Sequence, residues 1–147
     1  MTEKLHLEDL NPGDVFKSGE YTLEADEIKT FARQYDPQPF HLDEEAARDT
    51  FFQGLAASGW HTCAITMRLF VESVPIAGGL IGAGSDVAWS QPTRPGDVLH
   101  VVSTILDITP SRSKPDRGIV TIQSDTVNQR DELCQRAVSR VLAFRRG

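Results

Sequence analysis

The residue types that could do chemistry are concentrated in the segment Asp36-Pro37-Gln38-Pro39-Phe40-His41. A carboxylate and an imidazole stand five positions apart, and the two prolines between them cannot continue a helix. Such a stiff turn holds two proton-transfer groups near each other, which general acid–base catalysis on a small substrate requires. The same spacing also suits an ordinary turn, in which the aspartate caps local amides and the histidine is partly buried.

A helix is predicted to lead into this turn. Thr22 is a suitable N-cap, acidic residues follow it, and Asp36-Pro37 ends the pattern. The apolar positions recur at helical spacing and are Ile28, Phe31, Ala32 and Tyr35. Asp43 is expected to cap a second, short helix over residues 44–48.

The chain beyond Ser58-Gly59 predicts one long apolar helix followed by a sheet. Residues 60–74 are apolar on more than one stripe, which is typical of a helix buried on most sides. The segments that follow are rich in Val, Ile and Thr and are divided by Pro, Gly, Asp and Asn; they are 80–91, 98–109, 118–127 and 133–145. These four segments predict consecutive antiparallel strands curved around the helix, and a short extended stretch is expected earlier, at 15–18. The expected fold class is α+β, with a single domain over residues 1–147.

Three segments, in the same order, resemble those of the MaoC-like hydratases and dehydratases. The segment YDPQPFHLD at 35–43 is similar to the family signature Asp-x-Asn-Pro-hydrophobic-His. The segment ASGW at 57–60 resembles the family's turn into a central helix, and WSQPTRPGDVL at 89–99 resembles its strand–turn–strand segment. The resemblance covers most of the chain from residue 22 onward. It implies the hotdog fold, a curved antiparallel β-sheet wrapped around a long central helix.

The resemblance also implies a reaction, the interconversion of 2-enoyl-CoA and (R)-3-hydroxyacyl-CoA thioesters. Asp36 and His41 would then be the acid–base pair, and the backbone N–H of Gly59 would stabilise the charge that develops on the thioester oxygen. A first-turn amide has no intrahelical partner, the helix N-terminus carries partial positive charge, and glycine admits a close approach. The CoA thioester is expected as a substrate, with no bound cofactor and no metal.

Further residues near these three are assigned to substrate binding: Gln38, Ser58, Trp60, His61 and Trp89. Gln38 and Ser58 stand where the family usually has Asn and His. The identity of the substrate's acyl group therefore remains open. His61 otherwise packs at the start of the central helix, and Trp89 otherwise packs in the core. Four basic residues lie in predicted turn segments: Arg94, Arg112, Lys114 and Arg117. Their side chains either contact the phosphates of CoA or are solvated.

Two other functions remain open on this fold. A hotdog acyl-CoA thioesterase often uses a carboxylate on the central helix, but residues 60–70 contain no Asp or Glu and Glu72 lies far along the helix. A non-catalytic subunit that binds acyl thioesters has no need of a paired Asp36 and His41. Either function would leave the predicted fold unchanged.

Two other kinds of site are disfavoured. The segment GGLIGAG at 78–84 lacks the order of a dinucleotide-binding loop, and a strand pattern rather than a helix follows it. A metal site built from Asp36, His41 and His61 lacks a tight ligand motif. Neither a nucleotide cofactor nor a metal is therefore expected.

The composition predicts a soluble cytoplasmic protein. The chain has a net charge of −6 and no stripe of Lys or Arg, which argues against nucleic acid and anionic membranes as partners. The N-terminus has no apolar stretch of a secretory signal, and Cys63 and Cys134 are expected as buried free thiols. A single hotdog domain leaves a sheet edge and one side of its helix uncovered, so a homodimer or a larger homo-oligomer is expected.

Overall fold

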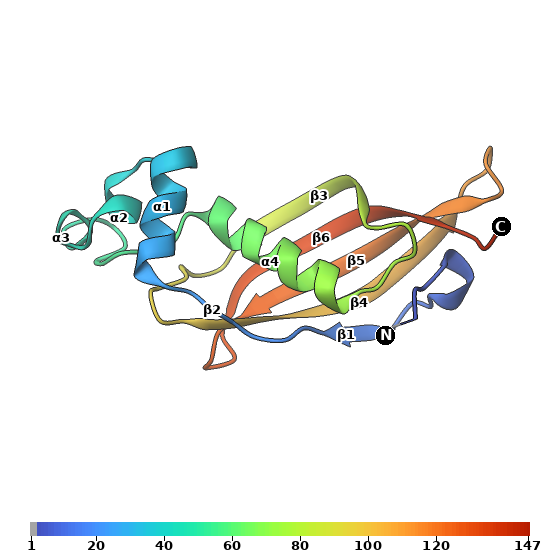
Figure 1. Cartoon of the computed structure of the whole chain (residues 1–147), viewed down its shortest axis with the longest axis horizontal. Helices are drawn as coiled ribbons and strands as arrows, with labels where there is room; N and C mark the ends of the chain where they lie inside the picture. Colours follow the sequence, from blue (N-terminus) through green and yellow to red (C-terminus); the bar gives the residue numbers. More distant parts are fainter. Residues whose placement is uncertain (1–2) are drawn as a thin grey trace.

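A curved antiparallel sheet with a long helix across one face is the main feature of the computed structural model, which describes residues 3–147 (Figure 1). The strands are β1 Val15–Lys17, β2 Tyr21–Thr22, β3 Ile81–Trp89, β4 Val98–Pro110, β5 Arg117–Val127 and β6 Leu133–Phe144. The helices are α1 Ala25–Tyr35, α2 Pro39–Leu42, α3 Glu44–Ala47 and α4 Gly59–Ser73, after a 3₁₀ helix at Leu7–Asp9. This is the hotdog arrangement that the sequence predicts.

The order of the strands differs from the predicted consecutive pairing at one place. The sheet runs β1-β4-β5-β6-β3, with β2 also paired to β4, so β4, β5 and β6 are neighbours as expected. β3 pairs antiparallel with β6 and not with β4. The connection between β3 and β4 is therefore a crossover to the far side of the sheet, and β3 forms an edge.

The core lies between α4 and the sheet in two clusters of buried side chains. Phe70 and Val74 pack with Ile105, Val120 and Ile122, among others, and Ile65 and Leu69 pack in a second cluster with Leu23, Ile28 and Leu99. Burying these side chains contributes about 1.5–3 kcal/mol each relative to leaving them exposed. The prediction that the helix is buried on most sides is wrong for the single chain, because a second apolar stripe of α4 is exposed: Trp60 (62%), Met67 (46%) and Val71 (50%).

The helices α1 to α3 form a lobe beyond one end of α4 (Figure 1). The prediction that Thr22 is the N-cap of α1 is wrong, because Thr22 pairs with Val98 in the sheet. Glu24 takes that place, and its N–H donates to the Glu27 carboxylate at 3.0 Å. Asp43 caps α3 as predicted, since its carboxylate accepts from two amides of that helix. No helix within residues 3–147 has both the length and the apolar character needed to span a membrane.

Candidate active site

Asp36 lies directly after α1 and is held by side chains on both of its carboxylate oxygens. Ser58 Oγ donates to Oδ2 at 2.6 Å, and the Gln38 amide donates to Oδ1. Burial raises the pKa of the Asp36 carboxyl, but these two hydrogen bonds and the nearby His41 favour the charged form, and the pKa falls below its ordinary value. Asp36 is therefore an ionised carboxylate with a fixed orientation. Gln38, assigned to substrate from the sequence, contacts Asp36 and also lines the cavity described below.

His41 lies on α2, a one-turn helix in place of the predicted turn. Pro39 begins this helix, a position where its missing N–H costs nothing. The imidazole is buried, with Nδ1 at 2.7 Å from the Ala56 carbonyl oxygen and Nε2 at 3.4 Å from Asp36 Oδ2. Because a carbonyl oxygen only accepts, Nδ1 carries the proton of this contact. Nε2 is thus the nitrogen that faces Asp36 and is available for proton transfer.

Ser58 and Gly59 begin α4 beside this pair. Ser58 is the N-cap and accepts from the Trp60 N–H at 3.2 Å. Gly59 is the first helical residue, so its N–H has no intrahelical carbonyl to bond. A Cβ at Gly59 would lie 2.6–2.9 Å from three atoms of the Trp89 ring, so only glycine fits against this indole.

Asp36, His41 and Gly59 line one cavity of about 590 Å³, whereas Ser58 is fully buried and does not line it. Its polar side chains include Asp36, Gln38, His41 and Thr62, and much of the remaining wall is aromatic, from Phe40, Phe51, Phe52, Trp60 and Trp89. Trp89 is 46% exposed, so the alternative that it packs in the core is wrong. Its Nε1–H donates to the Gly59 carbonyl at 3.2 Å and to Gln135 Oε1 at 2.9 Å, which fixes the indole over the start of α4.

His61, like Ser58, is a predicted substrate-binding residue that does not line this cavity. Its ring is stacked on Phe31, with centroids 4.6 Å apart and planes at 4°, and only 7% of the residue is exposed. Its Nδ1 is buried without a hydrogen-bond partner. Burial lowers the pKa of His61, and Glu27 offsets this in part. His61 packs at the helix start, and residues 3–147 contain no cluster of His, Cys, Asp or Glu that could hold a metal ion.

Several parts of the site have no signal in the sequence pattern. The Ala56 carbonyl that orients His41 is a backbone group, and the aromatic wall at Phe51 and Phe52 comes from the loop between α3 and α4. Arg94 is not a solvated turn residue, because it is half-buried and its guanidinium donates to three carbonyls of this loop. Only the fold brings the Ala56 carbonyl to His41, and Arg94 to the loop at Phe52.

Comparison with known proteins identifies relatives of this chain. Residues 9–128 match the MaoC like domain family. The crystal structure of a MaoC-like dehydratase from Rhodospirillum rubrum shares 62% sequence identity and superposes with a TM-score of 0.96, over 97% of this chain and 99% of that one. The protein YdeM of Bacillus subtilis is 35% identical over 86% of this chain and 90% of its own.

A third relative is mesaconyl-CoA hydratase from Haloarcula marismortui, which is 32% identical over 91 residues. This match covers 62% of the present chain and only 25% of the hydratase. The matched family domain, the hotdog sheet around α4 and the close superposition on the Rhodospirillum rubrum dehydratase agree with one another. The chain belongs to the MaoC-like domain family of hydratases and dehydratases.

Proposed function

We propose that this protein is a hydro-lyase that interconverts 2-enoyl-CoA and (R)-3-hydroxyacyl-CoA thioesters. The observation that carries the proposal is the arrangement of Asp36 and His41, whose Oδ2 and Nε2 lie 3.4 Å apart at the wall of a largely aromatic cavity. A related protein named mesaconyl-CoA hydratase adds support, since its substrate is a CoA thioester.

In the hydration direction, Asp36 accepts a proton from water as the water oxygen bonds to C3 of the enoyl group. The electron pair of the double bond moves toward the thioester carbonyl, and a proton on His41 Nε2 passes to C2. The Asp36 proton then returns to His41 across the short gap between Oδ2 and Nε2, so both groups end as they began. Dehydration follows the same steps in reverse.

The negative charge on the thioester oxygen needs a donor that is already oriented. The Gly59 N–H at the start of α4 suits this role, because the helix N-terminus adds partial positive charge and the residue lines the cavity beside Trp89. Ser58 assists indirectly by holding Asp36 at the same helix end.

A thioesterase mechanism has weaker support. Asp36 is the only carboxylate among the described residues that line the cavity, and its Oδ2 is paired with His41 Nε2 at 3.4 Å. Glu72, the acidic residue of α4, is exposed near the other end of the helix, and its Oε2 lies 3.9 Å from Arg68 Nε. A binding-only subunit would not require this paired arrangement of acid and base.

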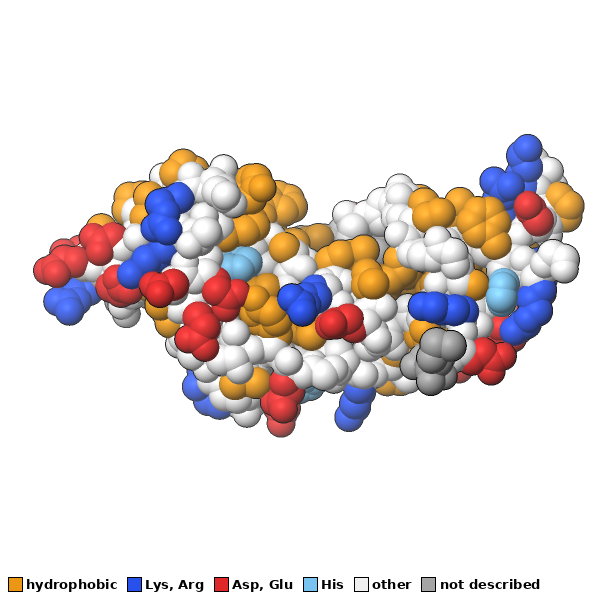
Figure 2. All heavy atoms as spheres, in the orientation of Figure 1, with side chains coloured by type: hydrophobic (Ala, Val, Ile, Leu, Met, Phe, Trp, Pro, Cys, Tyr) orange, Lys and Arg blue, Asp and Glu red, His pale blue; other side chains and the backbone are white. Residues whose placement is uncertain are grey.

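We also infer that two copies of the chain pair through α4 and the edge strand β3. A second cavity of about 420 Å³, with a largely apolar wall, lies between these elements, and Trp60, Met67 and Val87 are part of that wall. Hydrophobic side chains are exposed along the middle of the molecule, where α4 lies (Figure 2). A second copy would cover this surface and the unpaired edge. The cytoplasm remains the expected compartment for such an enzyme.

The reaction is tested by mixing the purified protein with crotonyl-CoA. Absorbance of the enoyl thioester is followed in one cuvette, and a thiol-trapping reagent is added to a parallel one. We expect the enoyl band to decrease without release of thiol. Release of CoA thiol would identify a thioesterase, and no change with crotonyl-CoA or with longer and branched enoyl-CoA substrates would indicate a protein that only binds.

A further inference from the structure

We propose that Arg94 is a positioning residue, which keeps His41 in its Nδ1–H tautomer by holding the backbone of the segment formed by residues 52–58. The proposal rests on the proposed function, in which His41 Nε2 transfers a proton. Neither the family match nor the names of the relatives assign a role to this arginine. Its guanidinium is not part of the cavity wall, so a direct contact with substrate is not its role.

The hydrogen bonds of the Arg94 guanidinium are all with backbone carbonyls of one short loop. Nη2 donates to the Phe52 carbonyl at 2.6 Å, and Nη1 donates to the Gly54 and Leu55 carbonyls at 3.0 and 3.2 Å. The planar guanidinium presents its donors in a fixed fork, which a lysine ammonium cannot reproduce. Its side chain has no carboxylate partner among the described residues, so the cation serves the loop alone.

The loop requires such a donor because its conformation is unusual. Gln53 has a φ of 55°, a left-handed conformation that a side chain other than glycine rarely adopts. Around it, three carbonyl oxygens converge on one point, where they would repel one another and lack partners without the guanidinium.

The same segment carries the groups that orient the acid–base pair. The Ala56 carbonyl accepts from His41 Nδ1, and the Ala56 N–H donates to the Phe40 carbonyl at 3.0 Å. Two residues later, Ser58 Oγ donates to Asp36. A shift of the loop at its Arg94 anchor therefore moves the acceptor that sets the tautomer of His41.

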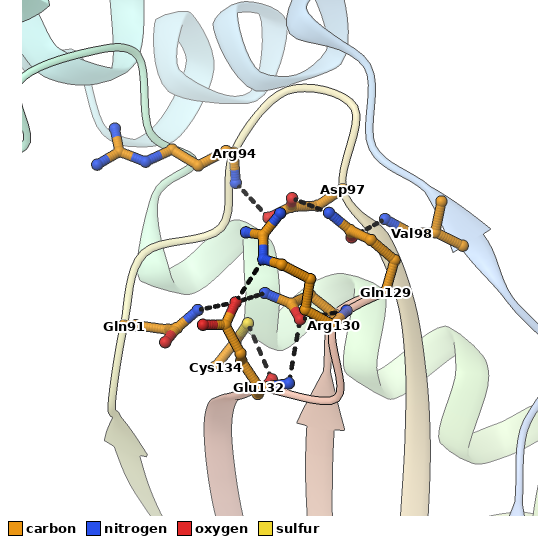
Figure 3. A network of polar contacts seen from close by, with 9 residues as sticks. Gln91, Arg94, Asp97, Val98, Gln129, Arg130, Glu132 and Cys134 are labelled. Carbon is orange, nitrogen blue, oxygen red and sulfur yellow. Dashed lines mark hydrogen bonds and ion pairs between the residues drawn. The ribbon is translucent and has the colours of Figure 1, made fainter.

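Arg94 is itself fixed by the turn between β3 and β4. Its backbone N–H donates to Asp97 Oδ2 at 2.8 Å, and Gln129 Nε2 donates to Asp97 Oδ1 at 3.1 Å. Gly96 has a φ of 86°, so this turn requires glycine. Figure 3 shows the Arg94 side chain extending away from Asp97, which leaves the guanidinium free to reach the loop.

The kinetic test compares R94K and R94A with the wild type in crotonyl-CoA hydration. We expect kcat of R94A to fall by about 10²-fold, the effect of a misplaced proton-transfer group, with a smaller change in KM and an altered pH profile. R94K should lie between the two. R136K is the matched control, because Arg136 pairs with Asp125 on an exposed strand surface. A folded R94A with the kcat and pH profile of the wild type would overturn the proposal, as would a loss that only follows the unfolded fraction.

A second readout does not depend on turnover. The ¹⁵N signals of the His41 side chain, assigned by comparison with H41N, should show in the wild type that Nδ1 keeps its proton and that Nε2 is the nitrogen that gains and loses one. In R94A, or in R94K if R94A does not fold, we expect a mixture of the two tautomers. Unchanged His41 signals would refute the role of Arg94 even if the protein is a hydratase. The expected shift in a protein that hydrates no enoyl-CoA would instead refute the proposed function and leave this role intact.

Discussion

Ser58 Oγ lies 2.6 Å from Asp36 Oδ2 and 3.2 Å from the Trp60 backbone nitrogen. One hydroxyl therefore accepts a hydrogen bond as the N-cap of the central helix and donates one to the proposed general base. The stability of α4 and the ionisation of Asp36 are consequently coupled through a single oxygen atom.

Replacing Ser58 with alanine should change both properties. S58A is expected to lose about 1 kcal/mol of unfolding free energy with the cap. It also loses a hydrogen bond that lowers the pKa of Asp36, so this pKa rises toward its ordinary value. Since the base must be ionised, the acidic limb of kcat/KM should move to higher pH. The pH profile of crotonyl-CoA hydration measures the shift.

S73A is the matched control for S58A. Ser73 Oγ donates to the Leu69 carbonyl at 2.7 Å in the last turn of the same helix, at the end away from Asp36. S73A should affect stability only. The coupling is refuted if S58A and S73A show the same acidic limb as the wild type.

Gly59 and Trp89 should show a strong energetic coupling. G59A places a methyl group 2.6–2.9 Å from the indole, so the ring must move, at a cost of about 1–3 kcal/mol for overpacking. W89L removes the ring, so the alanine should cost much less in the double variant. Urea unfolding of the wild type, both single variants and the double variant gives the coupling energy. Additive single effects would contradict the contact.

The fold could be predicted from the sequence because its main signals are local. The period-two segments match the four long strands, and the apolar segment at 60–74 matches α4 within one residue at each end. The pairing of β3 with β6 could not be predicted, since it depends on a crossover between distant segments. Thr22 failed as an N-cap because sheet pairing outweighed a local preference.

The candidate site could be predicted only for the groups that a motif carries. Asp36, His41 and Gly59 lie in short segments with recognisable chemistry, and the structure brings all three to one cavity. The Ala56 carbonyl and Arg94 act through backbone contacts between segments far apart in the chain, so no residue pattern marks them. His61 lies only two residues after Gly59, but the helix turns its ring toward Phe31.

His61 should make stability depend on pH. Burial lowers its pKa in the folded state below 6.5, so the unfolded chain binds the proton first as the pH falls. The unfolding free energy should therefore decrease from about pH 7.5 to about pH 5, and H61F should reduce this dependence. Asp36 contributes in a separate window, because its folded pKa lies below 3.8. Equal pH dependence in H61F and the wild type would contradict the role of this buried histidine.

If two copies pair through α4, a charged side chain on the exposed apolar stripe of this helix should dissociate the dimer. Met67 is 46% exposed on the apolar stripe that we assign to the interface, so M67E should shift the protein from a dimer toward its 16.3 kDa monomer. L106E is the control, because Leu106 is equally exposed on β4, away from that stripe. Light scattering after size exclusion gives the masses. A monomeric wild type, or equal effects of both variants, would refute the interface.

The most direct test of the account is a comparison of D36N with the wild type in both crotonyl-CoA turnover and acyl-CoA binding, with D116N on an exposed turn as the control. Asparagine keeps the shape of Asp36 but cannot accept a proton from water. We expect hydration to be about 10²–10⁴-fold slower in D36N, with binding largely retained and D116N unaffected. Turnover by D36N at the wild-type rate would contradict the assignment of Asp36 as the general base.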